Sequence, residues 1–169
     1  MAAASPHHAT PRTTPLPLEE SLRALDAHYQ AMPPVASMQL RVAGYDGDTL
    51  VLEAPLALHV NDKGCAFGGS LVSLLTLAGW GLVTLHVQQA GLDADVFVAD
   101  SEVRYLAPLF ADLRAQARLD AGQSWDDFIA TLRERGRARA TLVATVPLPD
   151  GGAATTCRAR FVAIARRRG

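Results

Sequence analysis

The sequence has 169 residues, of which 49% are hydrophobic and 20% charged, with a formal net charge of -1. This composition fits one globular domain with a short tail. The near-neutral charge gives no reason to expect a nucleic acid or an anionic membrane surface as partner. The two cysteines, Cys65 and Cys157, form no CxxC pair, which favours a protein of the reducing cytoplasm over a disulfide scaffold. No metal site is predicted.

Residues 1–17 contain four prolines among alanine, threonine and histidine. Such a segment has no periodic apolar face to bury and lacks the apolar core of a signal peptide. We therefore expect a disordered tail over residues 1–17 and a single domain over residues 18–169.

An uncharged stretch over residues 64–85 is long enough to span a bilayer. It starts with glycines, includes serine and threonine, and lies between segments with the pattern of amphipathic strands. A helix that is apolar on all sides is also what a surrounding sheet would bury. We expect a core helix and no membrane span.

The first half of the chain predicts two helices and a hairpin. Leucines at helical spacing indicate a helix over residues 18–31, ending before Pro33 and Pro34. Alternation indicates strands over 38–42 and 50–54, joined by a turn at Asp46 and Gly47. A loop over 58–67 then leads into the long apolar helix, which Gly91 ends.

The second half has mostly the period-two pattern of strands. Strands are predicted over residues 96–106, 113–119, 137–146 and 155–164. A short helix interrupts them, with Ser124 and Asp127 as its capping box, and residues 149–152 form a turn. One-sided strands indicate an antiparallel sheet. About six strands around one long helix make an α+β fold of the hotdog type, although periodicity does not define strand order.

The segment from His59 to Ser70 runs from a polar loop into the start of the long helix. The first turn of a helix presents unpaired N–H groups, and Gly68 and Gly69 carry no side chain to block them. A thioester carbonyl held there would gain stabilisation as negative charge develops on its oxygen. The alternative is that the two glycines only let the loop pass close to the sheet.

The spacing Asn61, Gly64, Phe67-Gly68-Gly69 resembles the Asn, Gly, His-Gly-Gly signature of hotdog acyl-CoA thioesterases, with phenylalanine in place of histidine. The runs over residues 61–71, 77–81 and 100–108 are similar to the thioesterase domain at the C-terminus of YiiD-type acetyltransferases. This resemblance extends through residues 136–139 and 160–164, and so covers about 35–165. The resemblance does not include the acetyltransferase half, so we expect a stand-alone version of the domain.

The resemblance implies a site between two subunits in which Asn61 orients the thioester or the attacking water. A backbone N–H of Gly68 or Gly69 would form the oxyanion hole. Thr76 occupies the position where many relatives have an acidic residue, and a hydroxyl is a poor general base near neutral pH. Catalysis therefore needs another base, or the protein binds without cleaving.

Asp62, next to Asn61, is the first candidate for this base, although an Asp in such a turn is more often structural. The other candidates also have simpler interpretations. Asp100 and Glu102 fit a charge-paired strand face, His59 fits a structural histidine, and Cys65 fits a packed small residue.

The phosphates of coenzyme A require cationic contacts. The candidates are Lys63, Arg104 and the cluster Arg133, Arg135, Arg137 and Arg139, of which Arg137 and Arg139 could equally belong to an exposed strand face. Phe67 and the helix leucines could line an acyl tunnel or simply form core.

The sequence therefore predicts a cytoplasmic hydrolase of acyl-CoA or acyl-carrier thioesters, acting as a homodimer, with a tetramer as the larger alternative. No cofactor is expected beyond the coenzyme A of the substrate. One rival is a binding module that holds the thioester without cleaving it, which Thr76 motivates. A second is a hydratase or dehydratase that uses His59.

Overall fold

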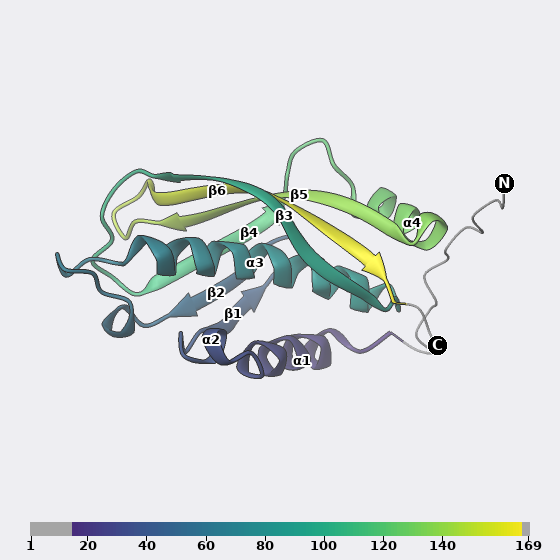
Figure 1. Ribbon diagram of the computed structural model, residues 1–169, viewed down its shortest axis with the longest axis horizontal. Helices are drawn as coiled ribbons and strands as arrows, with labels where there is room; N and C mark the ends of the chain where they lie inside the picture. Colours follow the sequence, from purple (N-terminus) through teal and green to yellow (C-terminus); the bar gives the residue numbers. More distant parts are fainter. Residues whose placement is uncertain (1–14, 167–169) are drawn as a thin grey trace, which may run out of the picture.

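The computed structural model describes residues 15–166 (Figure 1). Six strands form one antiparallel sheet in the order β1-β2-β4-β5-β6-β3, curled around the helix α3. The elements in chain order are α1 (Leu18–Gln30), α2 (Pro33–Ala36), β1 (Arg41–Tyr45), β2 (Leu50–Ala54), the 3-10 turn η1 (Leu56–Leu58), α3 (Gly68–Gln89), β3 (Ala94–Tyr105), β4 (Leu113–Leu119), α4 (Trp125–Arg135), β5 (Arg137–Pro147) and β6 (Ala153–Ala165).

The helix α3 is the centre of the fold. It has 22 residues, packs against five of the six strands and is crossed by α1 on the side that the sheet leaves open. It is the one helix of the described chain that is long and apolar enough to cross a membrane, but most of it is buried inside the protein. This burial accounts for its lack of charged residues.

Small side chains on the inner face of the sheet let the strands approach α3 closely. On β5 and β6 the inward positions are mainly alanine, including Ala138, Ala140 and Ala159, all nearly inaccessible to solvent. At Gly79 a β-carbon would lie 2.7 Å from the ring of Phe161, so the helix needs a glycine where this large inward side chain meets it.

The predicted elements are present, and the strand over residues 113–119 has the predicted bounds. The predicted start of the first strand is wrong, because β1 begins at Arg41 and not at Met38. Pro33 and Pro34 occupy the first turn of the short helix α2, a position that suits proline. Gln39 then has a φ of 49°, which interrupts an extended chain.

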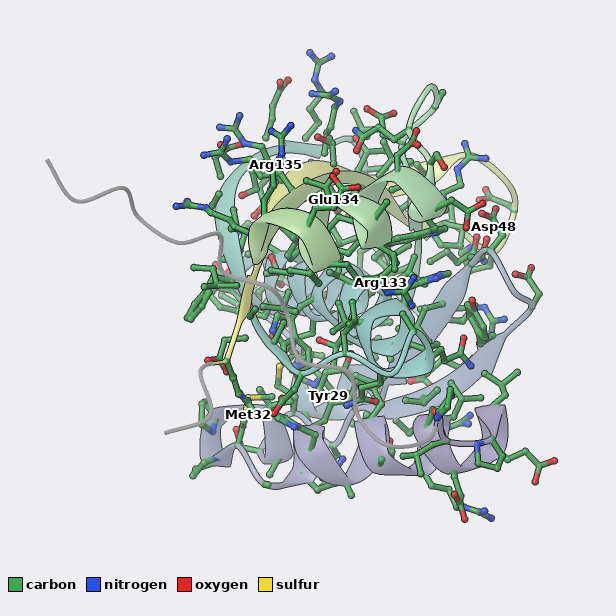
Figure 2. All side chains as sticks on the ribbon, turned by 90° about the vertical axis from the view of Figure 1, so that its right-hand side faces the viewer. Tyr29, Met32, Asp48, Arg133, Glu134 and Arg135 are labelled. Carbon is green, nitrogen blue, oxygen red and sulfur yellow. The ribbon has the colours of Figure 1, made fainter. Side chains whose placement is uncertain are left out.

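The helix α4 has the predicted cap, since Ser124 Oγ accepts a hydrogen bond from the N–H of Asp127 at 3.3 Å. Gly136 ends the helix with a φ of 66°. Arg133 Nη2 then donates to the carbonyl oxygen of Ala90, the C-cap of α3, at 3.1 Å. Figure 2 shows Arg133 between α4 and the end of α3, which joins the two helices at one end of the molecule.

The strand β3 lies at the edge of the sheet and pairs with β6 on one side only. Phe97 and Val98 are about half exposed on it.

The expected disordered tail lies outside the described residues apart from residues 15–17, which are exposed. One antiparallel sheet wrapped around one long helix is the hotdog fold.

Candidate active site at the start of the central helix

The loop before α3 is held in shape by Asn61. Its side-chain oxygen accepts hydrogen bonds from the N–H groups of Lys63 at 2.8 Å and Cys65 at 3.2 Å, and its Nδ2 donates to Cys65 Sγ at 3.2 Å. Gly64 has a φ of 77°, which closes the turn. The side-chain oxygen of Asn61 and one hydrogen of its Nδ2 are therefore used within the loop. Only the second hydrogen of Nδ2 is left for the predicted contact with substrate.

Two N–H groups at the start of α3 have no acceptor among the described residues. Phe67 is the N-cap and supplies no side-chain bond, while its carbonyl oxygen accepts from Ser70 at 3.0 Å and Leu71 at 3.1 Å. The N–H groups of Gly68 and Gly69 point away from the helix. Together with the partial positive charge of the helix end, they can stabilise a carbonyl oxygen that gains negative charge.

Two exposed aromatic rings border these N–H groups. A β-carbon at Gly69 would lie 2.4 Å from Phe67 Cε1, and one at Gly68 would lie 3.3 Å from Tyr105 Cε1. Tyr105 Oη also donates to the carbonyl oxygen of Gly68 at 3.3 Å. Sequence reasoning missed Tyr105, although an aromatic residue at the end of a strand that is more than half exposed suggests a contact surface.

A buried histidine is linked to the same turn of α3. His59 is 5% exposed, and its Nε2 lies 2.8 Å from the carbonyl oxygen of Met38. A carbonyl only accepts, so Nε2 carries a hydrogen, and in the tautomer with that hydrogen alone Nδ1 accepts from Ser70 Oγ, 2.8 Å away. Ser70, the residue after the two glycines, was not singled out from the sequence. Both ring nitrogens are used, which favours a structural or supporting role of His59 over direct contact with substrate.

The acidic candidates lie at the surface. The Asp62 side chain is 80% exposed and forms an ion pair with Lys63. Asp100 pairs with Arg160, and Glu102 with Arg104 at 3.1 Å, on the outer face of the sheet. Within one chain, the latter two carboxylates are therefore part of a charge-paired strand face.

Thr76 lies two turns along α3 from the glycines, about 12 Å by helical rise. It borders a shallow, mainly apolar pocket of about 330 Å³, formed with residues of α2 and α3. The other lining residues are Pro34, Val35, Met38, Val72, Ser73 and Leu77. Within residues 15–166 no group of three His, Cys, Asp or Glu side chains is arranged to hold a metal.

The arginine candidates are not brought to the glycines in one chain. Arg137 and Arg139 are on β5, beside the end of α4, while Gly68 begins α3 at the opposite end of the molecule (Figure 1). Lys63 is on the site loop, and Arg104 is one residue from Tyr105. The structure therefore groups Asn61, Asp62, Lys63, Phe67, Gly68 and Gly69 at one end, and Arg137 and Arg139 at the other.

Solved structures support the fold. A protein of unknown function from Chlorobaculum tepidum is 27% identical, with a TM-score of 0.84 over 90% of this chain and 99% of that one. A "putative thioesterase" from Shewanella oneidensis is also 27% identical, with a TM-score of 0.77 over 86% and 99%. A "probable thioesterase" from Pseudomonas aeruginosa, at 23% identity and a TM-score of 0.71 over 90% and 99%, is similar in fold.

The family model described as "Putative thioesterase (yiiD_Cterm)" matches residues 22–165, which include the Asn61 loop, the paired glycines and all six strands. The match contains the whole predicted resemblance, which began near residue 35, and adds most of α1. The chain is therefore a member of the YiiD C-terminal family of thioesterase-type hotdog domains.

Proposed function

We propose that this protein hydrolyses acyl-CoA thioesters at the N-terminus of α3. The observation that carries the proposal is the pair of N–H groups at Gly68 and Gly69, free of protein acceptors and bordered by Phe67 and Tyr105. Membership of a thioesterase-type family supports the same reaction. The thioester oxygen would accept from these N–H groups, and the acyl chain would follow α3 into the apolar pocket beside Thr76.

In this mechanism a water oxygen adds to the carbonyl carbon, and the carbon–sulfur bond then breaks. The proton lost by the water ends on the departing thiol, so a nearby group must carry it. Ser70 is placed for this role, because its hydroxyl donates to His59 Nδ1 and can pass a proton to that nitrogen. Asp62, the first candidate from sequence, would need to leave its ion pair with Lys63.

The proposed unit is a homodimer formed through β3. An edge strand of 12 residues with an unpaired side is a template for a second copy, and Val98, Tyr105 and Leu106 leave apolar surface beside it. Pairing about a two-fold axis would cover this surface.

Cys65 and Cys157 are free and buried, which fits the expected cytoplasmic location.

The test is release of free thiol from acyl-CoAs of graded chain length by the purified protein. Asn61→Ala, Asp62→Asn and Ser70→Ala would be assayed in parallel. Asp126→Asn is the control, because α4, which carries Asp126, lies at the opposite end of the molecule from the start of α3 (Figure 1). Loss of turnover in Ser70→Ala but not in Asp62→Asn would support the proposed proton path, and the reverse result would assign the base to Asp62.

If no acyl-CoA is cleaved while one binds with a dissociation constant in the micromolar range, hydrolysis of this substrate class is wrong. The protein would then be a thioester-binding module, as Thr76 suggested from the sequence. Release of enoyl product from a hydroxyacyl-CoA would instead support the dehydratase alternative.

A further inference from the structure

The free edge of β3 exposes backbone groups of six residues. Just outside its two ends, the carbonyl oxygen of Asp93 and the N–H of Leu106 form hydrogen bonds on the β6 side, at 3.1 and 2.8 Å. In an antiparallel pair, residues that bond to the neighbouring strand alternate with residues whose groups point away from it. The register on β6, with its shift between Val98 and Asp100, therefore directs the following residues to the free edge: Ala94, Val96, Val98, Ser101, Val103 and Tyr105.

Trp80 caps the first part of this edge. Its indole Nε1 donates to the carbonyl oxygen of Val96 at 2.9 Å, which is one of the acceptors that a further strand would use. The ring of His28 on α1 lies against the indole, with centroids 5.1 Å apart. Covering an edge in this way discourages pairing. Among residues 15–166, no group pairs with the outward N–H and C=O groups of Ser101, Val103 and Tyr105, so a strand can be added there.

The open part of β3 lies beside the first half of α3. The helix runs antiparallel to the strand, because Trp80 contacts Val96 while Gly68 contacts Tyr105. This first half is also the less covered part of the helix, since α1 lies against the later half (Figure 1) and Ser73 is exposed. A second copy that pairs with the open part of β3 would therefore cover exposed surface on both the strand and the helix.

Charged side chains favour one register for that pairing. Asp100, Glu102 and Arg104 share the outer face of the open part. A two-fold axis at Val103 would set Glu102 opposite Arg104 of the second copy, twice. An axis at Glu102 would set two glutamates face to face, an axis at Arg104 two arginines, and an axis at Ser101 would set Asp100 opposite Glu102. Only the axis at Val103 avoids facing like charges, and it also pairs all the open groups.

We propose that β3 pairs with β3 of a second copy about Val103, and that Ser101 of the second copy forms part of the wall of the thioester site. The inference rests on the proposed homodimer and adds its register. Ser101 and Tyr105 both face inward, and in this register they lie opposite each other with β-carbons about 5 Å apart. Because the Tyr105 ring lies over Gly68, the serine hydroxyl borders the same site.

Disulfide formation tests the register without any turnover. In the proposed register two Val103→Cys chains have Cα atoms about 5.5 Å apart, a distance that a disulfide spans. Pairing about the middle of β3, the main alternative, separates these atoms by about 20 Å and brings two Ala99→Cys residues near the axis. After mild oxidation, electrophoresis without reductant should show a covalent dimer for Val103→Cys and none for Ala99→Cys.

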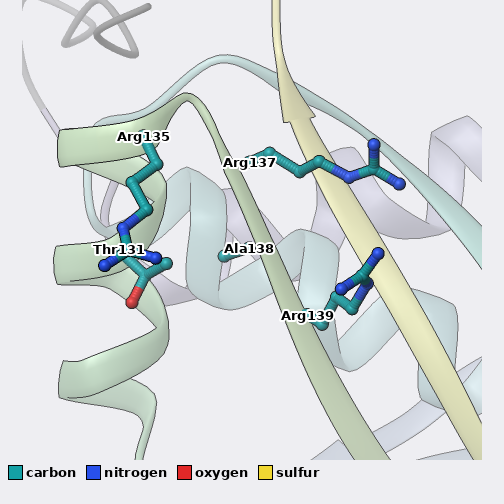
Figure 3. Close-up of a pocket in the computed structure, with 5 residues that line it drawn as sticks. All are labelled: Thr131, Arg135, Arg137, Ala138 and Arg139. Carbon is teal, nitrogen blue, oxygen red and sulfur yellow. The ribbon is translucent and has the colours of Figure 1, made fainter. Parts of the chain in front are cut away.

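Thr131→Cys is the control for bridging by random collision. Figure 3 shows Thr131 on α4, across β5 from β6 and so away from the edge of β3. The two native cysteines are buried and are the same in all variants. Bridging through Ala99→Cys in place of Val103→Cys would overturn the register, as would a dimer in sedimentation that neither variant bridges. A monomer in sedimentation would overturn the homodimer as well.

Trp80→Phe tests the cap on the edge, because it keeps an aromatic ring but removes the N–H that binds the Val96 carbonyl oxygen. The first part of the edge then becomes available. Bridging through Ala99→Cys should rise about threefold or more in the Trp80→Phe background, the effect of one further hydrogen bond in that register. Unchanged bridging would overturn this role of Trp80.

Complementation tests whether Ser101 acts on the site of the other copy. Ser101→Phe, which fills the space opposite Tyr105, is mixed and refolded with Gly69→Val, which blocks the glycine site of its own chain. At equal mixing half of the dimers are heterodimers with one intact site of two, so about a quarter of wild-type thiol release should return. Activity no greater than that of the two separate variants would overturn the arrangement. If wild type releases no thiol, the proposed hydrolysis fails, while the disulfide experiment still decides the register.

Discussion

The hydroxyl of Tyr29 occupies the space that a side chain at Gly81 would need. A β-carbon at Gly81 would lie 1.9 Å from Tyr29 Oη, which donates to the carbonyl oxygen of Leu77 at 2.7 Å. Tyr29 is fully buried between α1 and α3 (Figure 2), and burial raises the pKa of its hydroxyl well above the usual value. The contact joins α1 to the one side of the central helix that the sheet does not cover.

Gly81→Ala should therefore lower the free energy of unfolding by about 2–3 kcal/mol, the cost of overpacking a filled core. Urea denaturation measures the change. Tyr29→Phe removes the clashing oxygen, so the double variant should lose less than the sum of the two single changes. Strict additivity would show that Tyr29 and Gly81 do not share the space.

Gly69→Ala should reduce kcat/KM about tenfold or more while changing the free energy of unfolding by less than about 1 kcal/mol. The added methyl group must displace the Phe67 ring, which is 54% exposed and can rotate outward. The substitution should therefore change the geometry of the site and leave the packing of the core as it is. Thiol release and urea denaturation measure the two effects.

Gly68→Ala is the matched control, because its β-carbon would approach the Tyr105 ring only to 3.3 Å. It should lose less activity than Gly69→Ala. A larger loss in Gly68→Ala would contradict the assigned arrangement of the rings.

Ser70→Ala should lower kcat about a hundredfold, the lower end of what a positioned proton carrier contributes. It leaves His59 Nδ1 without a donor, which should cost about 1 kcal/mol of stability. Ser70→Thr keeps the hydroxyl and should restore most of kcat. Unchanged kcat in Ser70→Ala, or no rescue by threonine, would limit Ser70 to a structural role.

His86 should make the protein sensitive to acid. Its ring stacks on Trp125 with centroids 3.8 Å apart, and burial lowers the pKa of His86 from 6.5 to about 4, against a smaller raising effect of Asp48. The unfolded chain therefore binds the proton first, so stability falls as pH is lowered from about 6.5 towards 4. The loss should be on the order of 2 kcal/mol, because the ring keeps some contact with solvent.

Unfolding free energies of wild type and His86→Gln at pH 7 and pH 4.5 measure this effect. The difference between the two pH values should be smaller in the variant. An identical pH dependence in both proteins would mean that another group causes the acid sensitivity.

Val98→Glu should prevent dimerisation, because it places a charge on the half-exposed inner side of the edge strand β3. Sedimentation velocity should give a dimer for wild type and a monomer for the variant. Leu18→Glu, at a residue of α1 that is 40% exposed, is the control and should remain dimeric. A wild-type monomer at micromolar concentration would contradict the dimer.

Local pattern by itself determined most of the elements. The alternation of apolar and polar residues over β4 identified a strand, because successive side chains of a strand point to opposite faces. The long apolar stretch of α3 identified a buried helix. The same reasoning failed at Met38, where prolines and the positive φ of Gln39 replaced an expected strand with a helical turn.

Only the tertiary structure decided which distant residues meet. Tyr105 reaches Gly68, and His59 reaches Ser70, because the sheet closes around α3 and brings the end of β3 and the preceding loop to one turn of that helix. The same closure carries Arg137 and Arg139 to the opposite end. Their type and spacing could be identified from the sequence, but their separation from the glycines follows from strand order, which depends on long-range pairing that no local period encodes.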